Sequence, residues 1–97
     1  MAILMQMKWA GVTKDQYEAV RKSVGWETNK PEGGRCHVAA LDQDGLRVVD
    51  LWDSAELFNR FVETRLMPGV QAVGIKGQPQ VEILPIHAIY APGPFTL

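Results

Sequence analysis

The chain has few of the residues that build disulfides and metal centres. Among its 97 residues, Cys36 is the one cysteine, and His37 and His87 are the two histidines. One cysteine excludes an intrachain disulfide and a cysteine-based zinc site. Two histidines without a local spacing motif predict no metal site either. We expect Cys36 to be a buried core residue rather than a nucleophile.

The sequence also lacks an excess of charge of one sign and a long apolar run. It has 10 Lys and Arg against 11 Asp and Glu, which gives a formal net charge of −1, and no basic cluster that would neutralise phosphates. No run approaches the roughly 20 apolar residues of a membrane helix, and the first residues lack the basic leader of a signal peptide. These absences predict no nucleic-acid partner, no membrane partner and, by default, a cytoplasmic location.

Strand-like and helix-like segments alternate along the chain. The patterns predict strands over residues 2–9, 35–43, 46–52 and 80–92, and helices over residues 11–25 and from Asp53 to the region of Pro68. Thr13 and Gln16 form a capping box at the start of the first helix, and Asp53 is expected to cap the second. Pro68 bars continuation of the second helix as a regular helix.

The order of these elements predicts one ferredoxin-like domain over residues 1–97, an α+β fold with the arrangement β-α-β-β-α-β. Right-handed crossovers give an antiparallel sheet in the order 4-1-3-2 with both helices on one face. The opposite face is then bare. A chain of this length buries only about 60% of its unfolded surface, so we expect a second copy to cover that face in a homodimer.

The turn between the two middle strands sets which residues share a face. Asp44-Gly45 is typical of a type I′ hairpin turn, and it would pair Ala39 with Asp50 and His37 with Trp52. Alternation then separates two sets of side chains. His37 and Asp50 lie on one face, with Gln6 and with His87 of the last strand, whereas Cys36, Val38, Ala40, Val49 and Leu51 lie on the other. Because the second set is wholly apolar, we predict that it lies under the helices with Met5 and Met7, and that the first set faces the partner.

His37 and Asp50 are the candidate catalytic residues. They would be diagonal neighbours, with Cβ atoms roughly 7–8 Å apart. A carboxylate beside an imidazole fixes its tautomer and favours its action as a general base. A buried polar pair that fixes the dimer register explains the same two residues, so both interpretations remain open.

A second set of candidates would line a pocket for an apolar ligand. It consists of the polar or amphipathic residues Gln6, Tyr17, Trp52 and His87 and the apolar residues Met5, Met7, Phe58 and Phe61. An ordinary filled core explains most of the same residues. Gly33-Gly34 is not followed by a helix and therefore does not form a phosphate-binding loop. We expect no nucleotide or other cofactor.

The stretch RVVDLWDSAELFNRF, residues 47–61, carries a family resemblance. Its W-[DE]-S-x-x-x-F run at the junction of the third strand and second helix resembles the dimeric α/β-barrel superfamily and, more narrowly, the antibiotic-biosynthesis-monooxygenase-like domains. The segment GVTKDQYEAV, the following GW and the late P-x-H resemble an actinobacterial-type subgroup of small uncharacterised proteins. The resemblance implies a homodimer whose two sheets face each other.

Members of that superfamily include cofactor-independent monooxygenases, isomerases and haem-degrading enzymes. Haem-degrading members have a histidine after the second helix, and none occurs here between Trp52 and His87. We predict a homodimer that binds a small, largely apolar molecule without a bound cofactor. Three functions remain open: a cofactor-independent monooxygenase, a non-catalytic structural or interaction module, and an isomerase or decyclase that uses His37 as its base.

Overall fold

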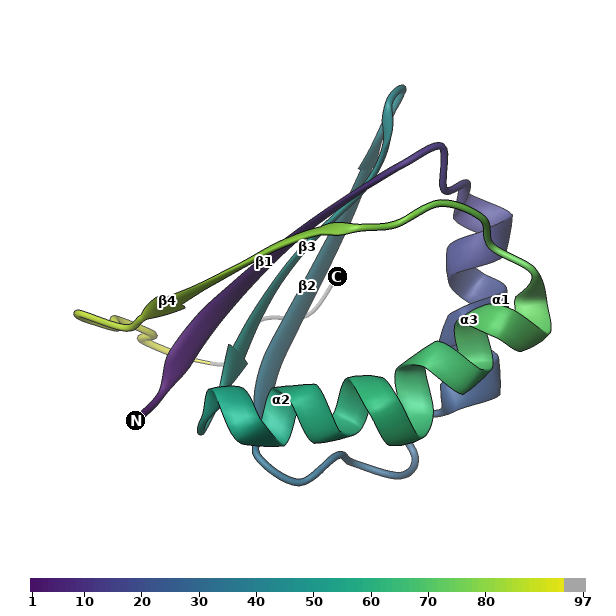
Figure 1. Cartoon of the computed structure of the whole chain (residues 1–97). Helices are drawn as coiled ribbons and strands as arrows, with labels where there is room; N and C mark the ends of the chain where they lie inside the picture. The colour runs from purple at the N-terminus through teal and green to yellow at the C-terminus, as the bar shows by residue number, and fades with distance from the viewer. Residues whose placement is uncertain (94–97) are drawn as a thin grey trace.

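The computed structural model describes residues 1–93 as a four-stranded antiparallel sheet with helices on one face (Figure 1). The elements are β1 (Ile3–Ala10), α1 (Lys14–Val24), β2 (Gly34–Asp42), β3 (Gly45–Trp52), α2 (Ala55–Phe61), the π-helical turn η1 (Val62–Leu66), α3 (Met67–Val73) and β4 (Gln80–Pro85). The strand order β2-β3-β1-β4 is the predicted order 4-1-3-2 read from the other edge. The predicted ferredoxin-like α+β fold is therefore confirmed.

The first helix begins and ends where the sequence indicates. The Thr13 side chain accepts a hydrogen bond from the backbone N–H of Gln16, and the Gln16 side chain accepts one from the backbone N–H of Thr13, at 3.1 and 3.0 Å. This is the predicted capping box. Gly25 ends α1 in the left-handed conformation, with φ of 67°, which glycine adopts without strain.

The second helix begins one residue later than predicted. Ser54, not Asp53, is its N-cap, and the Ser54 hydroxyl accepts a hydrogen bond from the backbone N–H of Leu57 at 3.2 Å. The Asp53 carboxylate is instead engaged by Arg35, whose Nε lies 2.7 Å from its Oδ1. The serine hydroxyl therefore satisfies the N–H group that is left free in the first turn.

Pro68 bars a regular helix, as predicted, but the chain stays helical around it. In the π-helical turn η1 the N–H of Met67 donates to the carbonyl of Val62, and α3 then starts with Pro68 in its first turn. Proline has no N–H group to donate and disrupts the regular i→i−4 ladder, and the π-helical turn just before it accommodates that disruption. In Figure 1, α2 continues through η1 into α3 as one bent helix, and α3 lies beside α1.

The turn between β2 and β3 lies one residue earlier than predicted. Asp42 pairs with Gly45, so Gln43 and Asp44 form the turn, and Asp42 Oδ1 accepts from the N–H groups of Asp44 and Gly45 at 2.7 and 3.1 Å. Within residues 1–93 only glycines have positive φ, so the type I′ prediction is wrong. Gly45 serves a different purpose, since a Cβ there would lie 2.3 Å from the carbonyl oxygen of Trp9 on β1.

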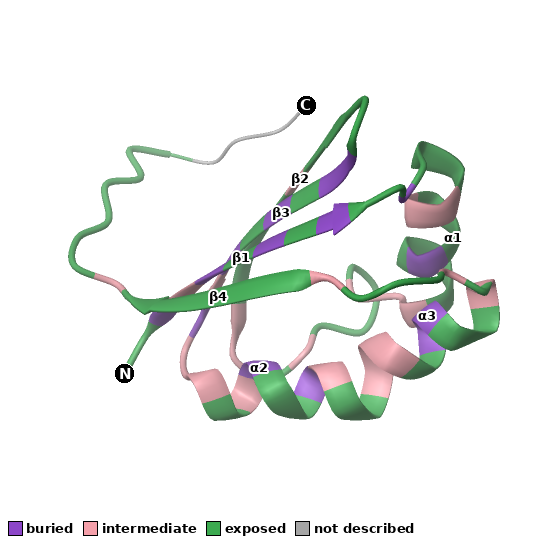
Figure 2. Ribbon diagram, turned by 45° about the horizontal axis from the view of Figure 1, so that its top comes forward, coloured by how far each residue is buried: buried purple, intermediate pink, exposed green. Residues whose placement is uncertain are grey.

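The core lies between the sheet and the helices. Its buried apolar residues are Ile3, Met5, Met7 and Trp9 of β1, Leu46, Val48 and Trp52 of β3, and Val12, Val20, Phe58, Phe61 and Val70 from the helical side. Figure 2 shows the resulting alternation of buried and exposed residues along β1 and β3. The predicted placement of Met5 and Met7 under the helices is therefore confirmed.

The predicted orientation of β2 and β3 is wrong. Asp50 is 7% exposed under the helices, whereas Val38 and Val49 on the opposite face are 56% and 38% exposed. Asp50 pairs with Met5 of β1 and so shares its face. A buried carboxylate is tolerated when its oxygens are hydrogen-bonded, and Arg47, which alternates with Asp50, reaches solvent on the open face.

Cys36 and β4 also differ from the prediction. Cys36 pairs with Leu51 and is exposed rather than buried, because that face of the sheet has no helix over it. β4 ends at Pro85, before the predicted limit at residue 92, and lies at the sheet edge as a strand proline indicates. None of the helices within residues 1–93 has the length and apolar composition needed to cross a membrane.

Candidate active site

A cavity of about 250 Å³ lies between the sheet and the helices. Its apolar wall includes Met5, Met7, Trp9, Val20, Val48, Phe58, Phe61 and Val70, and its polar groups include Tyr17, His37 and Asp50. Ligand pockets typically measure about 300–1,000 Å³, so this cavity suits a small ligand. The mostly apolar wall with a few convergent polar groups is typical of a small-molecule site.

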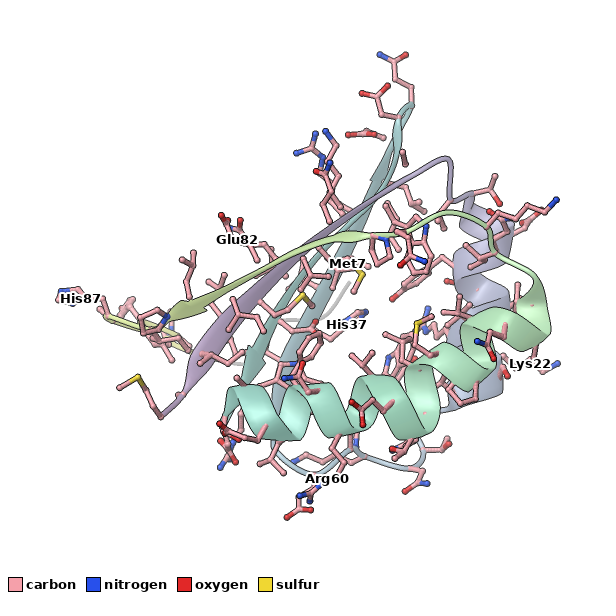
Figure 3. All side chains as sticks on the ribbon, in the orientation of Figure 1. Met7, Lys22, His37, Arg60, Glu82 and His87 are labelled. Carbon is pink, nitrogen blue, oxygen red and sulfur yellow. The ribbon has the colours of Figure 1, made fainter. Side chains whose placement is uncertain are left out.

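His37 and Asp50 meet at the wall of this cavity. They are directly opposite each other in the β2–β3 pairing rather than diagonal, and His37 Nδ1 lies 2.7 Å from Asp50 Oδ1. The side chain of Asp50 is 9% exposed and that of His37 is 31% exposed. In Figure 3, His37 points into the space between the sheet and the helices. The predicted pair therefore forms, but on the helix-covered face instead of the open one.

Trp52 supplies the second hydrogen bond to the Asp50 carboxylate. Trp52 Nε1–H donates to Asp50 Oδ2 at 3.1 Å, while Oδ1 faces His37. An ionised carboxylate only accepts hydrogen bonds, so the proton of this contact sits on His37 Nδ1. Among residues 1–93 no buried side-chain nitrogen or oxygen lacks a partner. Trp52 thus has a polar role at the site besides its packing against α2.

Tyr17 of α1 completes the network from the opposite wall. Its Oη lies 2.7 Å from His37 Nε2. Because Nδ1 carries the proton in the neutral ring, Nε2 accepts and the Tyr17 hydroxyl donates. The Tyr17 and His37 rings are parallel within 2°, with centroids 6.1 Å apart, and the Trp26 ring lies 5.0 Å from His37. The site is therefore a chain of hydrogen bonds that runs from Tyr17 through His37 to Asp50 and Trp52.

Burial raises the pKa of Tyr17 to about 12, an effect that is partly opposed by the nearby Arg21 guanidinium. The neutral hydroxyl is the favoured form of a desolvated tyrosine. Tyr17 is therefore protonated at neutral pH and able to donate to His37.

Charged residues lie near Tyr17 and along part of the cavity lining. Arg21 Nη1 lies 3.3 Å from Glu18, and Arg21 also bonds Glu27 through its Nε and Nη2 atoms. The hydrogen bond from Arg21 lowers the pKa of Glu27, so Glu27 stays ionised near neutral pH. Lys30 and Arg35 are among the residues that line the cavity. These groups are exposed and contribute little to stability.

Most of the predicted pocket residues line the cavity, but two of them lie elsewhere. Six of them, namely Met5, Met7, Tyr17, Trp52, Phe58 and Phe61, line the cavity together with His37 and Asp50. Gln6 instead faces the open side, because it alternates with Met5 and Met7 along β1. His87 is exposed beyond the end of β4, and Figure 3 shows it far from His37.

One residue of the site, Trp26, is not among the predicted site residues, and one contact between predicted residues, Tyr17 with His37, was not predicted. Trp26, which contacts the His37 ring, comes from the irregular segment after α1, where no periodicity places a side chain. The Tyr17–His37 contact joins α1 to β2 and depends on the helix-covered face of the sheet, which was assigned incorrectly. Within residues 1–93 no three His, Cys, Asp or Glu side chains come together as a metal site.

No protein-family model matches this chain, and no curated protein matches it in sequence. Solved structures share its fold. SnoaB, a cofactor-independent oxygenase from Streptomyces nogalater, aligns with a TM-score of 0.61 at 12% identity over 91% of this chain and 93% of its own. A monooxygenase from the gene ActVA-Orf6 of Streptomyces coelicolor, in complex with nanaomycin D, aligns with a TM-score of 0.54 at 16% identity over 95% and 92%.

A Mycobacterium tuberculosis protein aligns with a TM-score of 0.64 at 15% identity over 94% of this chain and 100% of its own. These sequence identities are low, so the likeness shows a shared fold and does not by itself indicate the activity of this chain. The chain shares its fold with these oxygenase and monooxygenase structures, as the resemblance read from residues 47–61 implied for the fold. The narrower resemblance to an actinobacterial-type subgroup stays a prediction.

Proposed function

We propose that this protein binds a small, largely apolar aromatic molecule in the cavity and oxygenates it without a bound cofactor. The observation that carries the proposal is the hydrogen-bonded pair of His37 and Asp50 at the wall of an apolar cavity. A carboxylate-oriented imidazole at the wall of a mostly apolar cavity is suited to accept a proton. The shared fold with SnoaB and the ActVA-Orf6 monooxygenase supports the same class of reaction.

The chemistry needs an acidic C–H or O–H group on an electron-rich ring system. Removal of that proton leaves an anion that can transfer an electron to molecular oxygen. A C–O bond then forms, and loss of water converts a methylene group into a carbonyl. One oxygen atom enters the product and the other leaves as water. All the electrons come from the substrate, so the balance requires no external reductant.

Anthrone is a suitable probe because it has three fused rings and one methylene group activated by a carbonyl. We expect the protein to convert anthrone and oxygen into anthraquinone and water, faster than buffer does at the same pH. Oxygen uptake should match anthraquinone formation, and labelled oxygen should supply one atom of the product. His37→Gln should abolish the acceleration, whereas His87→Gln, at an exposed position outside the cavity, should retain it.

Two other functions remain as alternatives. An isomerase or decyclase that uses His37 as its base needs the same pair but no oxygen. Conversion of the probe without oxygen uptake would favour that reaction class. A non-catalytic structural or interaction module would give no rate above buffer, and a wild-type rate equal to that of His37→Gln would contradict the proposed base.

The protein is also proposed to be a homodimer through the open face of the sheet. Val38, Val49 and Leu84 lie on that face and are 56%, 38% and 43% exposed. Exposed apolar patches of this kind mark association surfaces. Sedimentation at micromolar concentration should give twice the chain mass of 10.8 kDa. Val49→Lys should shift the protein to monomer, and a wild-type monomer would contradict the dimer.

A further inference from the structure

We propose that Tyr17 is the catalytic residue that touches the ligand, and that a proton passes from the ligand to His37 through the Tyr17 hydroxyl. The inference rests on the proposed function, since it assumes a ligand with an acidic proton in this cavity. It goes further because it names the atom that receives the proton.

Both ring nitrogens of His37 already have hydrogen-bond partners within the protein. Nδ1 faces Asp50 Oδ1 at 2.7 Å, and Nε2 faces Tyr17 Oη at 2.7 Å. Although 31% of the His37 side chain is exposed, no nitrogen is left to contact a ligand. Trp26 contacts the same ring from a further direction. A ligand in the cavity therefore meets the hydroxyl of Tyr17 and not the imidazole nitrogen.

The Tyr17 hydroxyl is able to accept a second hydrogen bond. It donates its one proton to Nε2, which leaves the oxygen lone pairs as acceptors. Tyr17 itself lines the cavity. An O–H or activated C–H group of an aromatic ligand can thus donate to Oη while the existing bond to His37 is kept.

In each of the two proton transfers, one bond to hydrogen breaks and one forms. The ligand's X–H bond breaks as a new O–H bond forms at Oη of Tyr17. The original O–H bond of Tyr17 breaks as an N–H bond forms at Nε2 of His37. The products are a ligand anion, a neutral Tyr17 and an imidazolium, which the Asp50 carboxylate stabilises. Tyr17 never has to exist as a free phenolate, which agrees with the raised pKa that burial gives it.

Other charged groups face Tyr17 from the elements around it. Arg21 favours its anionic form, and Glu18 on the same helix, Glu27 of the following segment and Asp50 of β3 disfavour it. Arg21 is ion-paired with both glutamates, so its positive charge and their negative charges act in opposite directions on Tyr17.

The test uses 2-naphthol, an aromatic alcohol whose absorption spectrum distinguishes the neutral form from the anion. Bound to the wild-type protein, 2-naphthol should ionise at a pH about one unit or more below its value in buffer. Tyr17→Phe should abolish this shift but keep binding, because only the hydroxyl is removed. Tyr90→Phe is the matched control, since Tyr90 is the other tyrosine and is 84% exposed.

The outcomes separate the relay from the proposed function. A shift that persists in Tyr17→Phe and disappears in His37→Gln would overturn the relay and leave His37 as the direct base. Failure of the wild type to lower the ionisation pH of 2-naphthol would overturn the relay, and oxidation of anthrone by the same protein would then leave the proposed oxygenase standing. A shift lost in Tyr17→Phe and His37→Gln, with no oxidation of anthrone, would support the relay and reject the oxygenase.

Discussion

Replacing Asp50 with asparagine is expected to lower the rate of anthrone oxidation by about 10²–10⁴-fold, the usual contribution of a positioned acid or base. The wild-type carboxylate accepts from His37 at Oδ1 and from Trp52 at Oδ2. An amide offers one acceptor atom and one donor group. Because the Trp52 indole can only donate, the asparagine oxygen should face Trp52 and its NH₂ group should face His37.

That rearrangement changes the tautomer of the His37 imidazole. An NH₂ group can bond His37 Nδ1 only if this nitrogen carries a lone pair, so the ring proton moves to Nε2. The Nε2–H group then points at Tyr17 Oη and can no longer accept its proton. The substitution thus leaves the shape of the site intact and removes its ability to take up a proton.

Two measurements check this prediction. Initial rates should fall in Asp50→Asn and stay unchanged in Asp44→Asn, a control in the exposed hairpin turn. The nitrogen chemical shifts of the His37 ring should show that the proton has moved from Nδ1 to Nε2. A variant that keeps the wild-type rate would show that the carboxylate only supports the structure.

The sequence predicted the topology correctly because several independent local signals agreed. The capping box of Thr13 and Gln16, the terminal Gly25 and the alternation of strand and helix patterns each depend on neighbours within a few residues. The hairpin turn was misplaced because Asp42, rather than a pair of residues with positive φ, closes it. That choice depends on the close approach of β1 to Gly45, a long-range contact.

The candidate site was predicted in its residues but not in its location. Alternation grouped His37 with Asp50 correctly, because both the predicted and the observed register keep them on one face. Apolarity then suggested the wrong face for the helices, since Val38 and Val49 are as apolar as core residues. Arg47, on the same face as Val49, was the contrary signal, because an unpaired arginine is rarely buried.

Pattern analysis could not predict that both carboxylate oxygens of Asp50 accept a hydrogen bond. The two donors that make its burial tolerable come from different elements, Trp52 two residues along β3 and His37 on β2. Tyr17 joins them from α1. Such a network follows only from the packing of helix on sheet, and the same packing leaves an apolar cavity beside it.

Phe61→Ala is expected to lower the free energy of unfolding by about 3–5 kcal/mol, the usual loss for a buried phenylalanine. Phe61 is 9% exposed, its ring lies 5.3 Å from that of Trp52, and the guanidinium carbon of Arg65 lies 5.4 Å from its centroid. The ring also forms part of the cavity wall. Its removal would therefore enlarge the cavity instead of letting neighbouring side chains close the gap.

Urea unfolding at a fixed protein concentration measures this loss, since association would add to the apparent stability. Asn59→Ala, on the exposed side of the same helix, should change the free energy of unfolding by no more than about 0.5 kcal/mol. The enlarged cavity of Phe61→Ala should also bind ligands with an additional fused ring more tightly than the wild type does. A loss of stability below about 1 kcal/mol would mean that the ring faces open space, and that α2 contributes less to the wall of the cavity than its burial indicates.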